Sequence, residues 1–275
     1  MKNFKDAYIK MEFHGIHLPD KNAPSLPGKK ISEGRNANVY EWGEDSVIKL
    51  FKTSYPTELV TTEYYNAMAV KSLPFNKAMA LELKKTEFGF GIVFKKVYGE
   101  NMLDYIDRTG DLEGAARILA DLQKSINKCT FDISNNKSFE TAHQQLREKM
   151  MASKKADSDA TKEMIRFLGT MKEGNSLCHG SLHPDNIMLT QTGSVALSAS
   201  SYCLGNPLYD IARTFFMIAY NPLPGEKKDG GSECPYCRGI TNMEDRKIFG
   251  RHYLDAMGKS ATEIGGYLSM IIAGM

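Results

Sequence analysis

The segment from Cys178 to Arg213 constrains this chain more than any other part of the sequence. It begins Cys-His-Gly-Ser-Leu-His-Pro-Asp-Asn-Ile-Met, and Ala199 follows thirteen residues after Asn186. The run Gly-Asn-Pro-Leu-Tyr-Asp-Ile-Ala-Arg then leads into apolar residues at helical spacing. The segment predicts a polar loop held between short strands, which we expect at residues 176–179, 187–189 and 195–197.

Length and charge limit what the rest of the chain forms. Its 275 residues exceed the usual prior of about 100 to 200 residues per domain, which favours one compact unit of two lobes. The 35 basic and 33 acidic residues give a net charge of +2 at pH 7 without a block of like charges. We therefore expect neither nucleic acid nor a membrane as a partner.

The N-terminal residues lack the apolar run and small-residue cleavage site of a signal peptide, and no stretch approaches the roughly 18 apolar residues of a membrane span. We therefore expect a cytoplasmic protein. Its five cysteines are an odd number, so we expect reduced thiols.

The first part of the chain, residues 1–98, predicts a small antiparallel β-sheet with one helix. Residues 1–29 form an N-terminal extension, in which residues 7–18 alternate loosely as a strand or cap. Apolar residues at helical spacing predict one helix, which Pro74 should end. The expected strands are residues 30–34, 38–42, 46–51, 80–85 and 91–97, and the expected helix is residues 57–72.

The second part, residues 99–275, changes to a period of about 3.6 residues, which indicates a mainly helical lobe. The expected helices are residues 112–129, 139–151, 160–171, 211–219, 242–257 and 262–272. The polar loop of the opening segment would then lie where the two lobes meet.

Three features of the first part fit the binding of a phosphate-bearing nucleotide when they are taken in order. Gly34 and Asn36 lie in a turn between two strands, where a phosphate-covering loop would lie. Lys49 follows in the next strand, and Glu63 on the next helix offers a carboxylate to its ammonium group. Each feature alone fits an ordinary turn or a solvated lysine.

The motif set resembles the aminoglycoside phosphotransferase and choline kinase branch of the protein-kinase-like superfamily. In that branch the loop reads His-Gly-Asp-x-His-Pro-x-Asn, a strand ends in Ile-Asp, and Gly-Asp/Asn-Pro-x-Tyr/Phe-Asp follows. The resemblance covers about residues 30–253. The matching residues are His179, Gly180, His183, Pro184, Asn186, Gly205, Pro207, Tyr209 and Asp210.

The resemblance implies an α+β, bilobal kinase-like fold that binds ATP or another nucleotide between a β-sheet lobe and a helical lobe. It makes Asn186 a metal ligand and Asp210 an acid that braces the loop. The residues implied to bind the nucleotide are Gly34, Asn36, Val47, Lys49, Glu63, Lys96, Tyr98 and Leu189.

Two positions depart from the family pattern. Ser181 stands where the catalytic aspartate is expected, and Ala199 stands where the main magnesium ligand is expected. A serine hydroxyl is no carboxylate base near pH 7, and an alanine side chain offers a cation no oxygen. We therefore expect weak or absent Mg²⁺ binding and a degenerate phosphotransferase, a pseudokinase.

Two other functions stay open at this stage. The chain is an active small-molecule kinase if Asp185 or His183 replaces the missing base, and it is a binding or scaffolding protein if no nucleotide binds. The sequence defines neither the small-molecule acceptor nor the oligomeric state. Cys234 and Cys237 form a Cys-x-x-Cys pair without the context of a redox or zinc site, so we interpret them as loop thiols.

Overall fold

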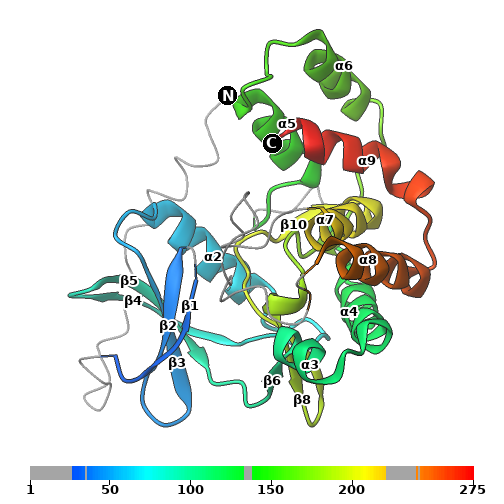
Figure 1. Cartoon of the computed structure of the whole chain (residues 1–275). Helices are drawn as coiled ribbons and strands as arrows, with labels where there is room; N and C mark the ends of the chain where they lie inside the picture. The colour runs from blue at the N-terminus through cyan, green and yellow to red at the C-terminus, as the bar shows by residue number, and fades with distance from the viewer. Residues whose placement is uncertain (1–26, 35, 133–137, 221–239, 241) are drawn as a thin grey trace. The chain divides into compact units, whose positions relative to one another are not determined.

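The computed structural model describes residues 27–34, 36–132, 138–220, 240 and 242–275 (Figure 1). The strand or cap expected at residues 7–18 and the Cys234–Cys237 pair lie outside them. The chain divides into two compact units, one of residues up to Val60 with Leu81–Lys95, the other of Thr61–Ala80 with Lys96–Met275. The boundary expected near Tyr98 stays a prediction, because compactness does not measure independent folding.

The first unit is built on the predicted antiparallel sheet, whose strand order is β1-β2-β3-β5-β4. Trp42, Ile48 and Val93 pack into its apolar core, with Tyr40 against them. A Cβ at Gly91 would lie 2.8 Å from the Ile48 side chain, so this strand pair packs closely. The strands are β1 (Lys30–Glu33), β2 (Ala37–Glu41), β3 (Ser46–Phe51), β4 (Ala80–Thr86) and β5 (Gly89–Lys95).

The helix α2 (Thr57–Ala69) starts in the first unit and continues into the second. It ends before the predicted Ser72, because Lys71 and Leu73 donate their N–H groups to carbonyls only three residues back. Leu73 also precedes Pro74, and a residue before proline avoids the helical region.

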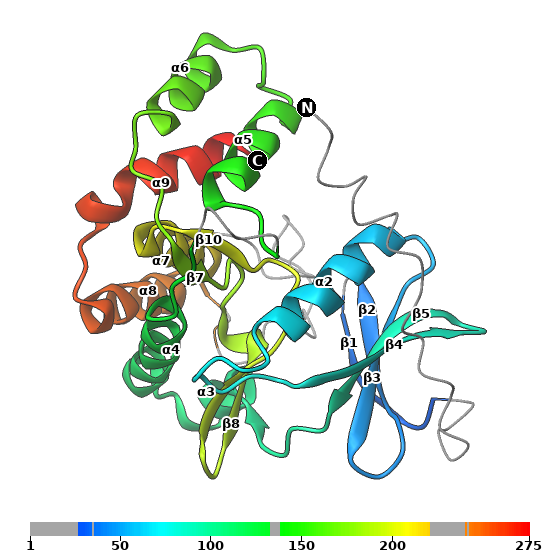
Figure 2. The ribbon, with the colours of Figure 1, turned by 180° about the vertical axis from the view of Figure 1, so that it is seen from behind.

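The second unit is mainly helical, as expected, and its helices α4, α7, α8 and α9 gather around a shared core (Figure 2). Ala116, Leu119 and Ile126 of α4 are fully buried, as are Phe249 and Tyr253 of α8. The helices are α3 (Met102–Thr109), α4 (Leu112–Asn127), α5 (Ala142–Ala152), α6 (Asp159–Leu168), α7 (Pro207–Ala219), α8 (Met243–Met257) and α9 (Ala261–Ala273).

Two small sheets in the second unit hold the loop of interest. One pairs β7 (Ser176–Cys178) with β10 (Cys203–Gly205), and the other has the order β6-β8-β9. A 3₁₀ turn, η2 (Pro184–Asn186), connects the loop to β8. The strands of the second sheet are β6 (Glu100–Asn101), β8 (Ile187–Thr190) and β9 (Gly193–Ala196).

The predicted helices start and end within a few residues of the observed ones, and capping accounts for the differences. α5 starts at Ala142 rather than residue 139, because Thr141 and Gln144 form a capping box. α7 starts four residues early, because Asn206 caps it and Pro207 fits the first turn. Two short elements, α3 and β10, were not predicted, although apolar spacing at Met102, Leu103 and Ile106 and the caps Asn101 and Gly110 mark α3.

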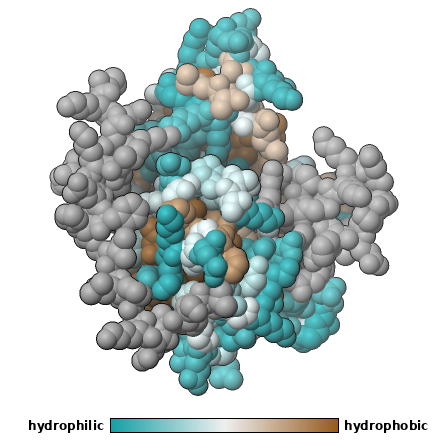
Figure 3. Space-filling model, turned by 90° about the vertical axis from the view of Figure 1, so that its left-hand side faces the viewer, coloured by the Kyte–Doolittle hydropathy of each residue, from teal (hydrophilic) through white to brown (hydrophobic). Residues whose placement is uncertain are grey.

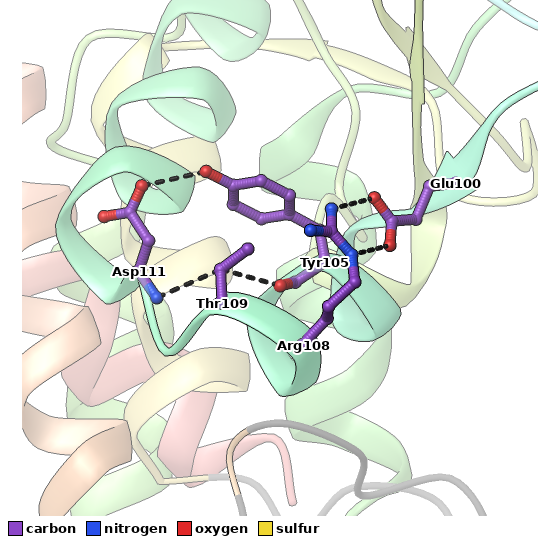
Figure 4. A network of polar contacts seen from close by, with 5 residues as sticks. All are labelled: Glu100, Tyr105, Arg108, Thr109 and Asp111. Carbon is purple, nitrogen blue, oxygen red and sulfur yellow. Dashed lines mark hydrogen bonds and ion pairs between the residues drawn. The ribbon is translucent and has the colours of Figure 1, made fainter.

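A polar network fixes the turn between α3 and α4 (Figure 4). Asp111 caps α4 by accepting the Gly114 N–H at 2.8 Å, and its second oxygen accepts the Tyr105 hydroxyl at 2.9 Å. Arg108 donates two hydrogen bonds of 2.8 and 2.9 Å to the carboxylate of Glu100. These bonds lower the pKa of Glu100 and, through the Gly114 N–H first, that of Asp111.

The surface carries both hydrophilic and hydrophobic side chains. Figure 3 shows one face, on which hydrophilic side chains cover much of the coloured area and hydrophobic ones form a smaller area between them. Within the described ranges, no helix combines the length and apolar character needed to cross a membrane.

We expect Asp111→Ala to lower the free energy of unfolding by about 1 kcal/mol, because α4 loses its N-cap. Urea denaturation followed by circular dichroism measures this loss. Asp121→Ala, which removes an exposed acid further along the same helix, serves as the control and should change stability by less than about 0.5 kcal/mol. Equal effects of the two substitutions would contradict the capping role.

Candidate functional site

The candidate site is the loop that follows β7, residues 179–186. Its start is fixed by Gly180, which has a φ of 72°. A Cβ there would lie 2.3 Å from the Ser201 carbonyl oxygen, so both the backbone conformation and the space require glycine.

A single buried carboxylate holds this loop in place. Asp210, on the first turn of α7, is fully buried and accepts the backbone N–H groups of His179 at 3.1 Å and Gly180 at 2.8 Å. Asn127 of α4 donates a third hydrogen bond to it at 2.9 Å and a further one to the Leu177 carbonyl. These bonds confirm that Asp210 braces the loop, as the resemblance implied.

Arg213 lies one helical turn after Asp210 on α7 and reaches the same loop. Its Nε donates to the Gly180 carbonyl oxygen at 3.2 Å, so the guanidinium lies next to the backbone that leads to Ser181. Neither Arg213 nor Asn127 had a role predicted from the sequence. Only Arg213 was within a recognised motif, as the last residue of Asp-Ile-Ala-Arg.

His179 orients Ser181 through its ring. Its Nε2 lies 3.0 Å from the Leu197 carbonyl oxygen, which can only accept, so the proton is on Nε2 and Nδ1 is an acceptor. The Ser181 N–H donates to that Nδ1 at 3.3 Å, and the Ser181 hydroxyl lies 3.5 Å from it. Burial lowers the pKa of His179, so the ring stays neutral near pH 7.

Asn186 fixes the other side of the loop and sets the tautomer of His183. Its Nδ2 donates to the Ser181 carbonyl oxygen at 2.9 Å and lies 3.1 Å from His183 Nε2. His183 Nε2 is therefore an acceptor, and the proton is on Nδ1, which is buried without a hydrogen-bond partner among the described residues. Burial, and then the nearby His179 and Arg213, lower the pKa of His183 to about 4.

The contacts of Asn186 leave its Oδ1 accessible and without a hydrogen-bond partner in the described part of the chain. This oxygen is the atom that a cation would contact. Asn186 thus has the geometry of the metal ligand that the resemblance implies, although metal binding itself stays a prediction.

Residue 199 is held by α2 through its backbone. Glu63 Oε1 lies 3.3 Å from the Ala199 N–H and 3.4 Å from the Ser198 hydroxyl. Asn66, one turn further along α2, donates to the Ala199 carbonyl oxygen at 3.0 Å. The Ala199 side chain is 5% exposed. No motif in the sequence pointed to Asn66.

The oxygen donors near residue 199 do not fit the metal site of the family. The Ala199 carbonyl already accepts the Asn66 amide, and its side chain has no oxygen. Within the residues that the structure describes, no three His, Cys, Asp or Glu side chains are grouped to hold a metal ion. Asn186 Oδ1 is the candidate oxygen that remains among the groups described above, and weak or absent Mg²⁺ binding stays a prediction.

The candidate nucleotide-binding residues of the first unit lie on the sheet and its first turn. Gly34 donates its N–H to the Ala37 carbonyl at 2.9 Å, and Asn36 is exposed. Val47 and Lys49 lie on β3 opposite Phe94 and Ile92 of β5, and the Lys49 ammonium is 5.1 Å from the centre of the Phe51 ring. Their binding of a nucleotide, and the pairing of Lys49 with Glu63, stay predictions.

The remaining candidates belong to the second unit. The Lys96 ammonium lies 5.5 Å from the centre of the Tyr98 ring, which is 63% exposed. Leu189 pairs with Glu100 in the small sheet, and its carbonyl lies so close to Gly99 that a Cβ there would be 2.2 Å away. The Asp185 carbonyl accepts the Asn101 amide at 3.0 Å. Their functional roles stay predictions.

Comparison with known proteins agrees with this geometry. The model of a family described as "Phosphotransferase enzyme family" matches residues 29–232. No sequence among the curated proteins matches the chain. The chain thus has a kinase-like α+β fold, and it belongs to the phosphotransferase enzyme family.

Solved structures of similar fold include aminoglycoside phosphotransferases. APH(3'')-Id from Streptomyces rimosus is 12% identical, with a TM-score of 0.55 over 93% of this chain and 94% of that one. The aminoglycoside-3'-phosphotransferase of type VIII is 14% identical, with a TM-score of 0.54 over 92% and 94%. The GDP and kanamycin complex of APH(2")-IIia is 14% identical, with a TM-score of 0.54 over 98% of this chain and 87% of that one. At this identity the likeness concerns the fold.

We expect Asp210→Ala to lower the free energy of unfolding by about 3 kcal/mol or more, because it leaves the buried donors of His179, Gly180 and Asn127 without their acceptor. Chemical denaturation measures the loss. Asp210→Asn keeps one acceptor oxygen and should lose less, and Asp107→Ala, at an exposed position of α3, is the control. A loss at Asp210 no larger than at Asp107 would refute the bracing role.

The free energy of unfolding should also decrease as the pH is lowered, because of His183. A histidine in the unfolded chain ionises near pH 6.5, whereas the pKa of the folded His183 is about 4, so the unfolded state binds more protons between these values. Stability is therefore complete above about pH 6.5 and decreases towards pH 4, by on the order of 3 kcal/mol. Denaturation of the wild type and of His183→Gln at several pH values measures this, and parallel curves would contradict it.

Proposed function

We propose that this chain is a degenerate member of the phosphotransferase family that binds a nucleotide and transfers little or no phosphate. The observation that supports this most directly is the state of residue 199. Its side chain is a buried methyl group, and its backbone N–H and carbonyl both bond to α2. The position that the resemblance assigns to the main magnesium ligand therefore has no oxygen free for a cation.

The state of Ser181 supports the same proposal. A positioned acid or base contributes about 10² to 10⁴ in rate, which is roughly 3 to 5 kcal/mol of transition-state stabilisation. The hydroxyl of Ser181 lies near His179 Nδ1, but that nitrogen already accepts the Ser181 N–H, and burial lowers the pKa of the ring. Neither group supplies a carboxylate to an attacking hydroxyl.

The two candidate replacements for the base are poorly suited. His183 has a pKa of about 4, and its Nε2 faces the Asn186 amide. Asp185 lies in the 3₁₀ turn, and its backbone carbonyl is held by Asn101. The alternative of an active small-molecule kinase would require one of these two residues to reach the acceptor, and no observed contact favours it.

Nucleotide binding is proposed from the family and from its solved members. Similar solved structures are complexes with GDP, ATP or ADP. The resemblance assigns the nucleotide contacts of this chain to Lys49 and Glu63, together with Gly34, Asn36, Val47, Lys96, Tyr98 and Leu189. The proposal includes the cytoplasmic location expected from the sequence and leaves the acceptor open.

Calorimetric titration with ATP and GTP, with and without Mg²⁺, tests the binding half of the proposal. Single-turnover transfer to a panel of amino-alcohols and aminoglycosides tests the other half. We expect nucleotide binding that Mg²⁺ strengthens little and no transfer. Clear turnover would refute the degenerate function, whereas no binding of either nucleotide would favour the scaffolding alternative.

Restoring the two acids provides the matched comparison. The double variant Ser181→Asp, Ala199→Asp should make nucleotide binding depend on Mg²⁺, because a carboxylate at residue 199 adds an anionic oxygen to the one that Asn186 offers. The single variant Ser181→Asp is the control and should leave the metal dependence as in the wild type. A double variant without metal dependence would show that the assigned positions are wrong.

A further inference from the structure

We propose that the loop around Ser181 is a binding site for an oxyanion, the phosphate or carboxylate group of a small molecule, formed by Arg213, Ser181 and His183. The site rests on the proposed function in one respect only, since it requires that residue 181 does not act as a carboxylate base. The binding of a nucleotide at Lys49 is a separate matter.

Arg213 provides the positive charge. Its Nε is used by the Gly180 carbonyl oxygen at 3.2 Å, which fixes the guanidinium beside the loop. Within the described ranges, neither an ion pair nor any further hydrogen bond of this side chain is present, so its two terminal nitrogens remain as donors. Arginine presents such donors in a planar fork that fits phosphate and carboxylate oxygens.

The carboxylate one turn before Arg213 on α7 already has its own hydrogen-bond partners. Asp210, on the same helix, uses one oxygen for the Gly180 N–H and the other for the His179 N–H and the Asn127 amide. No ion pair joins it to Arg213 in the described part of the chain. The guanidinium therefore has charge and donors beyond those that the fold uses.

Two further donors belong to the same loop. The Ser181 hydroxyl is half-buried, and its one contact among the described residues is the 3.5 Å approach to His179 Nδ1, which it shares with its own N–H. The His183 Nδ1–H is buried without a partner among those residues, because Asn186 directs its amide to the opposite nitrogen of the ring. Asn186 also ties the two residues together by bonding the Ser181 carbonyl.

These groups share one property, which is that they donate. Among the contacts that the structure shows for the Arg213 guanidinium, the Ser181 hydroxyl and the His183 Nδ1–H, none is to a carboxylate. The resemblance assigns an aspartate to position 181, whose carboxylate would supply acceptors. Serine removes both the oxygens and the negative charge, and a bound oxyanion would replace both.

Titration of the wild-type chain with inorganic phosphate and, separately, with acetate tests the proposal, with ³¹P or ¹³C line broadening and calorimetry as readouts at constant ionic strength. We expect saturable binding of at least one anion. Tighter binding of phosphate would indicate a phosphorylated ligand, and tighter binding of acetate would indicate a carboxylate. If neither anion binds saturably, the proposal is refuted.

Two variants locate the binding. Arg213→Gln should weaken it about tenfold to a hundredfold, because it removes charge-assisted hydrogen bonds. Ser181→Asp should abolish it, because the new carboxylate repels the ligand and takes its donors. Arg117→Gln, at an exposed position of α4, is the control for the loss of one positive charge and should bind as the wild type does. Wild-type affinity in either of the first two variants overturns the site.

Two further measurements distinguish binding at this loop from binding at the nucleotide residues and from a loss of folding. Circular dichroism melts verify that each variant is folded. If Arg213→Gln does not fold, the anion affinity of Ser181→Asp tests the site instead, because that substitution introduces the residue of the family pattern. Lys49→Ala should leave the anion affinity unchanged. If Lys49→Ala loses anion affinity and Arg213→Gln does not, the anion binds at the nucleotide residues and the proposal is refuted. Phosphotransfer by the wild-type chain would refute only the proposed function.

Discussion

The buried carboxylate of Asp210 is the interaction on which the candidate site depends. It accepts two successive N–H groups of the loop after β7 and the side chain of Asn127, so one charge fixes β7, α4 and α7 relative to the loop. Burying a carboxylate is costly unless hydrogen-bond donors surround it. Here two donors are backbone N–H groups of the loop, and the third is the Asn127 amide of α4. The position of Ser181 and Asn186 therefore follows from α7, which lies well after them in the sequence.

This scaffold is present, and Ser181 and Ala199 stand at the two positions to which the resemblance assigns acids. Gly180 retains its left-handed conformation, and Asn186 retains an accessible oxygen. Residue 199, by contrast, is joined to Glu63 and Asn66 by its backbone and offers no side-chain oxygen. Because the terminal nitrogens of Arg213 and the His183 Nδ1–H are donors that no described group accepts, we infer that a bound anion suits the loop better than the removal of a proton from an acceptor alcohol.

Much of the fold could be predicted, because local patterns specify it. Alternating strands around Gly34 and Gly43 indicated the meander, and the change to helical spacing after Gly99 indicated the second unit. Helix starts were less accurate where a cap decides them, as at Thr141 and Asn206, although both caps are visible in the sequence. The three-residue strand β10 was not predicted, because its pairing with β7 rather than a local pattern defines it, whereas α3 was overlooked although its caps and apolar spacing are visible in the sequence.

The sequence by itself indicated the family and the class of fold, and it singled out Ser181 and Ala199 as departures from the family pattern, because spacing and residue type are local properties of the chain. Only the tertiary structure decided what surrounds those positions. Arg213 reaches Gly180 and Asn66 reaches Ala199 across long sequence separations, and no periodicity predicts such contacts. The neutral, oppositely protonated rings of His179 and His183 likewise follow from the partners that folding brings to them.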